Sequence, residues 1–406
     1  MAVSVEVVLV LLTLSGMAYM VLALWGARAF SRWLGVRARV SGGDGEFAPP
    51  VTVLKPLKGG DARMYEGLRS HCVQVYGGAY ELVFGVSSAE DAACTVVERL
   101  RGEFPEVVMR LVVCPERLGT SGKVSNLVQM ARGARFEFVV VNDADIAVGP
   151  GYLAGVMRGF GDERVGMVTA LYVGRAIAKQ TGATQTMAKQ TGAGGRVGVW
   201  SRMEALGIST DFIPGVLTAR MLEGGIRFGL GSTLAMRRVA LRAAGGFEAV
   251  LECLADDYEL GARIAAAGYR VELCGEVVET SVPAYDFGGF RDHQMRWARS
   301  TRDSRRWGYV GLGVTFCVPW AMLTCVASGG ALWSFALLSL AVLLRVSVAL
   351  SVGVGVLRDG QVLRDLWLLP VRDWFGLGFW VWSFAGDTVV WREERFRLRG
   401  GRLERI

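Results

Sequence analysis

An uncharged apolar run near the start of the chain constrains its fold more than any other feature. No residue from Val7 to Ala27 is charged, and at about 1.5 Å per residue a helix over this run spans a bilayer core of roughly 30 Å. A cleaved secretory signal opens with basic residues, whereas Arg28 and Arg32 follow this run. The run therefore predicts an uncleaved transmembrane anchor over residues 1–30, with its amino terminus outside the cytoplasm.

A second apolar region lies toward the other end of the chain. After Arg306 the next charged residue is Arg345, and the apolar character continues to Leu357. This length is too great for one crossing and suits two helices that turn around Gly329. We therefore expect the C-terminal membrane helices to lie within residues 310–391.

The last apolar stretch, from Leu366 to Trp391, is interrupted by a proline and by charged residues. Charges at membrane depth are costly unless they are buried in protein or face water. A further full crossing would also place the basic tail, residues 392–406, outside the cytoplasm, against the positive-inside tendency. We therefore expect this stretch to lie at the interface or to re-enter the membrane.

Two short segments in the middle of the chain do not follow the surrounding pattern. Residues Met203 to Val216 mix apolar and polar side chains and are too few to cross a membrane, so a loop is expected, with an interfacial helix as the alternative. The sequence AKQTGA occurs at Ala178 and again at Ala188. Its Gly/Thr/Gln-rich surroundings, residues 178–193, indicate a flexible inserted loop.

The composition excludes several classes of protein. Of the 406 residues, 52% are hydrophobic and the mean hydropathy is +0.34, which is too apolar for an ordinary soluble enzyme. The net charge of +7 comes with no nucleic-acid motif, so an anionic membrane surface is the expected partner rather than nucleic acid. The seven cysteines include no Cys-x-x-Cys, which argues against a zinc site or a disulfide framework. Because His71 and His293 are the only histidines, a metal site must use mainly oxygen ligands, which suits Mg²⁺ or Mn²⁺.

Strand-like and helix-like runs alternate over residues 49–309. The strands are expected at VTVLK from Val51, YELVFGV from Tyr80, VVMRLVV from Val107 and FEFVVV from Phe136, with helices near Tyr65, Ala89 and Lys123. This alternation predicts an α/β domain with a mainly parallel sheet and right-handed crossovers. Ligands of such sheets bind beyond the carboxyl ends of the strands. The functional residues are therefore expected at those ends.

Two aspartates follow the last of these strands. Asp143 and Asp145 stand two residues apart, close enough for one or both to bind a divalent cation that bridges two phosphates. A nucleotide-sugar donor requires such a cation. An isolated Asp-x-Asp is also common in solvated turns, and it is the position after an apolar strand that favours the metal site here.

Two more aspartates stand at the starts of predicted helices. Asp91 follows YELVFGV and either caps the next helix or contacts a nucleotide. Asp257 lies in an Asp-Asp-Tyr-Glu-Leu run and either caps a helix or acts as the base for an acceptor hydroxyl. The residues alone leave both pairs of alternatives open.

Basic residues offer candidates for binding phosphate. The segment beginning at His293 opens a strongly basic stretch whose later arginines fit an interfacial anchor. Arg296 and Trp297 instead combine a phosphate-binding guanidinium with a flat ring. Lys123 either meets a diphosphate or caps a solvated helix.

Six motifs, taken in order, resemble the ceramide glucosyltransferase family, including bacterial hopanoid-associated glycosyltransferases. The resemblance extends from about Val51 to the membrane segment after Tyr309, so it covers most of the chain. The motifs are KPLKG at Lys55, SSAED ending at Asp91, GKVSNL at Gly122, NDAD at Asn142, LADDYELG at Leu254 and HQMRW at His293.

The resemblance implies a GT-A nucleotide-sugar fold, a UDP-sugar donor, a divalent metal, a lipid acceptor and inversion at the anomeric carbon. Asp91 matches the family aspartate implied to contact the nucleotide. Asp143 and Asp145 match the implied metal-binding pair, and Asp257 matches the implied general base.

Arg296 and Trp297 match the end of the family's Gln/Arg-x-x-Arg-Trp motif. His293 stands where that motif has Gln or Arg, and Gln294 beside it is the candidate to compensate. With Lys123, these residues complete the predicted nucleotide-sugar site.

The expected activity is the transfer of one hexose, glucose or N-acetylglucosamine, from a UDP-sugar to a ceramide or hopanoid hydroxyl. The expected place is the bacterial inner membrane, with the catalytic domain in the cytoplasm. Two alternatives are a processive polysaccharide synthase and a catalytically silent membrane scaffold. The sequence carries no signal for an oligomeric state.

Overall fold

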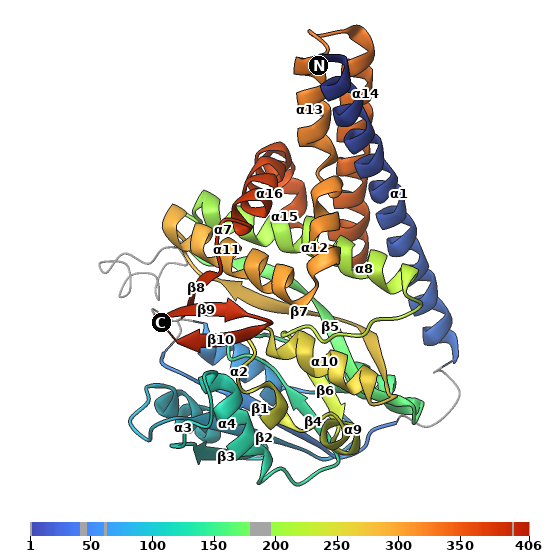
Figure 1. Ribbon diagram of the computed structural model, residues 1–406. Coiled ribbons are helices and arrows are strands. Elements are labelled where there is room, and N and C mark those ends of the chain that lie inside the picture. Colours follow the sequence, from blue (N-terminus) through green and yellow to red (C-terminus); the bar gives the residue numbers. More distant parts are fainter. Residues whose placement is uncertain (1, 41–46, 61–62, 179–195, 392–393, 406) are drawn as a thin grey trace. The chain divides into compact units, whose positions relative to one another are not determined.

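The computed structural model in Figure 1 describes residues 2–40, 47–60, 63–178, 196–391 and 394–405. Most of the repeat segment 178–193 therefore lies outside the described residues. The chain divides into two compact units. The helical unit comprises Met1–Trp33, Val173–Leu222 and Ser281–Arg397, and the sheet unit comprises Leu34–Tyr172, Glu223–Thr280 and Leu398–Ile406.

A seven-stranded sheet forms the centre of the sheet unit, and two of its strands, β5 and β7, continue beyond it. The strand order is β3-β2-β1-β4-β6-β5-β7. The strands are β1 (Val51–Pro56), β2 (Tyr80–Val86), β3 (Val108–Val113), β4 (Phe138–Val141), β5 (Val165–Ala176), β6 (Leu234–Arg237) and β7 (Arg270–Val282). Strands β1, β2 and β4 are almost fully buried, as their mainly apolar sequences predict for strands covered on both faces.

The predicted parallel pairing is confirmed for the first four strands, whereas β6 makes the sheet mixed. Strand β1 is parallel to β2 and β4, and β2 is parallel to β3. Strand β6 is antiparallel to both β4 and β5. Val141, the last residue of β4, pairs with Leu234, the first of β6, so the chain returns to the same edge of the sheet and runs backward. The local pattern of apolar residues does not reveal this long return.

Helices follow the strands of the sheet unit much as predicted. The helix expected near Tyr65 is α2, the one near Lys123 is α4, and the one expected from Ala89 begins slightly later. The bounds are α2 (Met64–Cys72), α3 (Ala93–Glu103), α4 (Gly122–Ala131), α5 (Tyr152–Met157), α9 (Arg238–Ala243) and α10 (Asp256–Ala266), with the 3₁₀ turns η1 (Arg158–Gly161) and η3 (Phe247–Val250).

The helical unit consists mainly of helices, several of them apolar. The helices are α1 (Ala2–Val40), whose last residues belong to the sheet unit, α7 (Val199–Gly207), the π-helix η2 (Ile208–Phe212), α8 (Ile213–Leu222), α11 (Phe287–Ser304), α12 (Arg306–Leu312), η4 (Gly313–Thr315), α13 (Cys317–Ala327), α14 (Leu332–Val348), the π-helix η5 (Ala349–Val356), α15 (Gln361–Asp365), η6 (Leu366–Leu368) and α16 (Leu369–Ser383).

Two helices among the described residues are long and apolar enough to cross a membrane, namely Ser4–Arg37 and Leu332–Val356. A helix pair bent by 52°, Arg306–Thr315 with Cys317–Ala327, meets the same test only when its halves are taken together. The predicted turn between α13 and α14 is confirmed, because the backbone there has positive φ angles of 63° at Gly329 and 78° at the next glycine.

The segment Met203 to Val216 is helical, so the prediction of a loop is wrong. It runs through α7, η2 and the start of α8. Met203 and Leu206 belong to the core of the helical unit, and Ser209 and Thr210 are buried as well. A helix that buries polar and apolar side chains together has no clear apolar stripe, which is why the sequence pattern hid it.

The last apolar stretch forms a short helix and then a strand. Helix α16 has its proline in the first turn, where proline is tolerated. Its charged residues Arg372 and Asp373 are buried in protein. Burial in protein is one of the two conditions under which charges at membrane depth are tolerated. The basic tail contributes to a small sheet with the order β10-β9-β8, made of β8 (Thr388–Trp391), β9 (Glu394–Arg399) and β10 (Arg402–Arg405).

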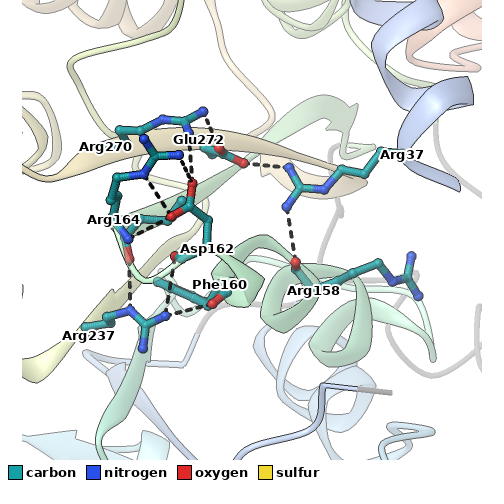
Figure 2. Close-up of polar contacts among 9 residues, drawn as sticks. Arg37, Arg158, Phe160, Asp162, Arg164, Arg237, Arg270 and Glu272 are labelled. Carbon is teal, nitrogen blue, oxygen red and sulfur yellow. Dashed lines mark hydrogen bonds and ion pairs between the residues drawn. The ribbon is translucent and has the colours of Figure 1, made fainter. Parts of the chain in front are cut away.

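Figure 2 shows a polar network around the carboxyl end of α1. Arg37 pairs with Glu272 of β7 at 2.5 Å and donates to the Arg158 carbonyl at 3.1 Å. Arg270 joins Glu272 at 2.7 Å and Asp162 at 3.1 Å. Arg37 belongs to the sheet unit itself, so these bonds hold the last turns of α1 against β7 within that unit.

Candidate functional site

The structure brings four of the predicted site residues together at the carboxyl ends of the strands in the sheet unit. Asp143 and Asp145 follow β4, Lys123 lies in the first turn of α4, and Asp257 lies in the first turn of α10. The ammonium group of Lys123 lies 2.9 Å from Oδ1 of Asp143. This edge of the sheet is the one at which the topology places ligands.

Lys123 is the counter-ion of the acidic residues rather than the cap of a solvated helix. Its side chain is only 12% exposed, and its Nζ also lies 3.1 Å from Oδ2 of Asp256. Burial alone would lower the pKa of Lys123, but the carboxylates of Asp143, Asp256 and Asp257 raise it above its ordinary value. Asp256 was not predicted as a site residue, and its place beside Asp257 was the signal available in the sequence.

Asp257 has the environment of a proton acceptor. Its Oδ1 accepts the backbone N–H of Tyr258 at 2.8 Å, and its side chain remains partly exposed. Burial, and then the charge of Asp256, raise the pKa of Asp257 to about 6, while Lys123 acts in the opposite direction. A carboxylate with a pKa near the working pH is suited to general base catalysis.

Gly231 separates the two central carboxylates. A Cβ atom at this position would lie 2.9 Å from Oδ2 of Asp257 and 3.9 Å from Oδ2 of Asp143. The absence of a side chain therefore leaves room for both carboxylates to face the same small space. Gly231 was not predicted from the sequence, because its role depends on contacts with residues distant in the chain.

A buried polar network supports the loop that carries Asp143. Asn142 is fully buried, and its amide donates to Tyr152 Oη at 2.8 Å, to the Ser232 carbonyl at 2.7 Å and to Thr233 Oγ1 at 3.2 Å. These bonds satisfy a side chain that would be costly to bury without partners. The network fixes the end of β4 immediately before the acidic pair.

A buried lysine lies beneath the same loop. Lys55 Nζ donates to the Asp143 carbonyl at 3.0 Å and lies 3.4 Å from Nε2 of His71. Burial lowers the pKa of Lys55 to about 7, against the charges of Asp145 and Asp143. Burial, and then the charge of Lys55, lower the pKa of His71 to about 3. His71 is therefore neutral near pH 7, and any positive charge of this pair at the base of the loop resides on Lys55.

The donor set around Asp143 and Asp145 fits a magnesium or manganese ion. Both side chains are carboxylates, and Oδ2 of Asp145 accepts a hydrogen bond from Thr280 at 2.7 Å. Burial, and then the charge of Asp143, raise the pKa of Asp145, so a nearby cation would stabilise its charged form. No three His, Cys, Asp or Glu side chains in the described part of the chain are grouped to hold a metal. Further ligands would come from phosphate or water, as is usual for Mg²⁺.

Asp91 lies at the start of α3 and has a structural role. Its Oδ1 accepts the backbone N–H groups of Gly59 and Ala93, both at 2.9 Å. The N-cap residue of α3 is Ala92, so Asp91 lies one residue before the cap, where its bond to Gly59 fixes the loop after β1. The predicted nucleotide contact of Asp91 remains a prediction.

Arg296 and Trp297 lie on α11 in the helical unit. The Trp297 ring contacts His293 at a centroid distance of 5.2 Å and Phe212 at 5.6 Å. His293 Nδ1 lies 3.0 Å from Oε1 of the buried Glu204. Gln294 donates to the other carboxylate oxygen of Glu204 at 2.7 Å, so it supports this carboxylate rather than standing free.

A cavity of about 230 Å³ lies beside Arg296 in the helical unit. One part of its lining is charged and another part is apolar. The lining residues are Arg291, Asp292, Met295, Arg296, Arg299, Trp382, Thr388, Val389 and Val390.

Comparisons with known proteins agree on one family. The sequence model described as "Glycosyl transferase family 21" matches residues 8–404. Ceramide glucosyltransferase 3 of Caenorhabditis elegans is 25% identical over 252 residues, which are 62% of this chain and 50% of that protein. Ceramide glucosyltransferase 1 of the same organism is 26% identical over 225 residues, or 55% and 44% of the two chains. The chain thus spans about half the length of the curated relatives it matches.

A solved structure shares the fold over nearly the whole chain. It is the mannosyltransferase PcManGT from Pyrobaculum calidifontis in complex with GDP-Man and Mn²⁺, with a TM-score of 0.50 and 20% sequence identity. The likeness covers 94% of this chain and 98% of that one. The predicted GT-A fold is confirmed by this likeness, which at such low identity concerns the fold alone.

Proposed function

Since the chain belongs to glycosyl transferase family 21, as its resemblance to ceramide glucosyltransferases predicted, we propose that it transfers one hexose from a UDP-sugar to a hydroxyl of a membrane lipid. The observation that carries the proposal is the acidic site in which Asp143 and Asp257 face one small space across Gly231. One carboxylate lies in the predicted donor site, and the other is suited to accept the proton of the acceptor.

Asp257 acts as the general base in this proposal. The acceptor hydroxyl approaches its free oxygen, Oδ2, and gives up its proton as the hydroxyl oxygen attacks the anomeric carbon of the sugar. Attack in line with the departing UDP inverts the configuration, so an α-linked donor gives a β-linked product. Asp256 and Lys123 tune the affinity of Asp257 for the proton through their charges.

Asp143 and Asp145 would hold a Mg²⁺ or Mn²⁺ ion at the donor diphosphate. When bound, the ion supplies neutralisation of the charge on the UDP leaving group. Thr280 orients Asp145, and Lys55 holds the backbone of Asp143 through its carbonyl. In the same proposal Arg296 and Trp297 contact the donor phosphates, and Asp91 contacts the nucleotide.

The donor sugar is glucose or N-acetylglucosamine, and the acceptor is a ceramide or a hopanoid polyol. The names of the matched relatives support the ceramide class. The two apolar helices support a membrane location. The arginines after the first of them support a cytoplasmic catalytic domain, and the proposed membrane is the bacterial inner membrane.

A processive polysaccharide synthase is the second candidate. Such an enzyme needs a channel for its polymer, and the described residues contain two helices that could cross a membrane, or three if the bent pair counts as one span. This small number favours transfer of a single sugar.

The test is to incubate the purified protein in lipid with labelled UDP-glucose or UDP-N-acetylglucosamine and with a ceramide or a hopanoid polyol. A product that is heavier by one hexose unit supports the proposal, and a polymer supports the synthase. Absence of both transfer and UDP-sugar hydrolysis would favour a catalytically silent scaffold.

Asp257→Asn is the decisive variant for the base. It should abolish transfer and leave UDP-sugar binding nearly intact. Glu259→Gln is the matched control, because it removes a carboxylate from the same helix start and should retain transfer. Near wild-type transfer by Asp257→Asn would refute the base assignment.

A further inference from the structure

A cluster of charged side chains inside the helical unit includes none of the residues named in the proposed transfer. Arg345 of α14 donates from Nε to both oxygens of Asp373, each at 3.0 Å, and from Nη1 to the Thr210 carbonyl at 2.9 Å. The side chains of Arg345 and Asp373 are only 4% and 6% exposed. This pair joins α16 and the π-helix η2 to a long apolar helix.

The cluster lies at membrane depth if the apolar helix spans the bilayer. The helix Leu332–Val356 has 25 residues, whereas a bilayer core of roughly 30 Å takes about 20. Arg345 is near the middle of this helix. It therefore lies inside the hydrocarbon core of the bilayer whichever stretch of about 20 residues of the helix spans that core. Ionisable groups at that depth are expensive and usually mark a functional site.

Asp211 is the accessible member of the cluster. Its Oδ1 accepts a hydrogen bond from Nη2 of Arg345, and its Oδ2 lies 3.4 Å from Nη2 of Arg372. Two guanidinium groups therefore neutralise its charge, and yet its side chain is 36% exposed. A carboxylate side chain that is partly exposed at this depth can accept a further hydrogen bond, which lipid tails cannot supply.

The backbone around Asp211 is also unusual. Asp211 lies in η2, a π-helical turn between α7 and α8, and such turns occur frequently at functional sites. The next residue, Phe212, contacts the ring of Trp297 at a centroid distance of 5.6 Å. Asp211 is thus adjacent in sequence to a contact of the Arg-Trp motif that the proposed function uses.

We propose that Asp211 binds the uncharged, hydroxyl-bearing head of the lipid acceptor. The inference rests on the proposed function and names an acceptor site for it. A lipid hydroxyl or amide N–H donates to the exposed carboxylate, and two arginines hold that carboxylate in place. A phosphate head group would be repelled by the carboxylate, so the site selects neutral polar heads over anionic phospholipids.

The first test is kinetic and uses the full chain in phosphatidylcholine nanodiscs, with a ceramide or a hopanoid polyol as the acceptor. Asp211→Asn is expected to raise the KM for the acceptor at least tenfold and to change the KM for the UDP-sugar less than twofold. Asp365→Asn is the matched control, because Asp365 is a buried carboxylate of the same unit paired with Arg202. It should leave both KM values unchanged.

The second test needs no turnover. A ceramide with a photoactivatable acyl chain should crosslink to the wild-type protein and at least fivefold less to Asp211→Asn. If the wild type crosslinks but transfers no sugar, the proposed function fails and the acceptor site stands. Equal crosslinking together with equal acceptor KM in both proteins overturns the site.

A folding defect is separated from a binding defect by a charge-balanced variant. Asp211→Asn combined with Arg372→Gln removes one charge of each sign and keeps the cluster neutral. This double variant should show the same loss of acceptor crosslinking with a wild-type melting temperature. Recovery of crosslinking in the double variant would assign Asp211 a purely structural role and overturn the proposal.

Discussion

The ammonium group of Lys123 lies 2.9 Å from Oδ1 of Asp143, one of the two carboxylates predicted to hold a metal ion. Lys123 therefore neutralises a carboxylate that would also hold the cation. The oxygens of a diphosphate donor can accept from Lys123 and bind the cation together. The charge of Lys123 also acts on the proposed base, Asp257.

The pH dependence of transfer should follow the ionisation of Asp257. A general base acts only when deprotonated, and the pKa of Asp257 is raised to about 6. We expect kcat/KM to be near its maximum above pH 7 and to fall as the pH drops through 6. Initial rates between pH 4.5 and 8.5, at a fixed free metal concentration, check this. A rate that stays constant down to pH 4.5 would contradict the assignment.

Two charge variants should shift the acidic limb of the pH profile, the fall in kcat/KM at low pH, in opposite directions. Asp256→Asn removes a negative neighbour and should lower the apparent pKa by about one pH unit, whereas Lys123→Met removes a positive neighbour and should raise it by a similar amount. The full pH profile of each variant is the measurement. Shifts of the same sign would show that Asp257 does not control the limb.

Gly231→Ala should block the space between the two carboxylates. The new Cβ would lie 2.9 Å from Oδ2 of Asp257, closer than packed atoms normally come. We expect kcat to fall by about a hundredfold, or about 3 kcal/mol of barrier, with the melting temperature nearly unchanged. The control is Gly151→Ala, whose added Cβ meets no atom within 4 Å. Wild-type kcat in Gly231→Ala would show that substrates do not occupy this space.

Removal of the divalent metal should abolish transfer. The affinity for the metal should depend on Asp145, because this residue is a proposed ligand. Asp145→Ala is expected to weaken Mn²⁺ binding strongly, and Thr280→Val, which removes the hydroxyl that donates to Asp145, should weaken it several-fold. Titration of Mn²⁺ by electron paramagnetic resonance measures both. Thr218→Val is the control, since the described partners of that hydroxyl, the Pro214 carbonyl and Tyr19, include neither aspartate of the acidic pair. Unchanged Mn²⁺ affinity in Asp145→Ala would remove it as a ligand.

The buried pair Arg345–Asp373 should behave as a coupled unit. Asp373→Ala leaves a buried guanidinium without its main partner and should cost about 3–5 kcal/mol of stability. Arg345→Met combined with Asp373→Met should recover most of this loss, because no unpaired charge then remains. Unfolding in detergent provides the measurement for both variants. Equal losses in the single and double variants would argue against this electrostatic account.

Several elements follow directly from local sequence. The predicted strand YELVFGV is β2 with the same bounds, Tyr80–Val86. The turn at Gly329 lies where the glycine pair predicted it. Both succeed because strand formation in a mainly apolar run and a turn at adjacent glycines depend on neighbouring residues.

Other features required the folded chain. Helix η2 mixes buried polar and apolar residues, so its pattern has no helical period. Strand β6 runs antiparallel because the chain returns to the edge at which β4 ends. Asn142, Gly231 and Lys55 act through contacts with residues far along the chain, which no local pattern records.

The sequence by itself determined the family, the apolar helices and the acidic residues at the ends of strands, since these depend on residue types and their spacing. Only the tertiary structure decided how those residues are used. It paired Lys123 with Asp143 and Asp256, bonded Asp91 to Gly59 and buried Arg345 against Asp373. Charge pairing and burial arise between distant segments, so they are settled only when the chain folds.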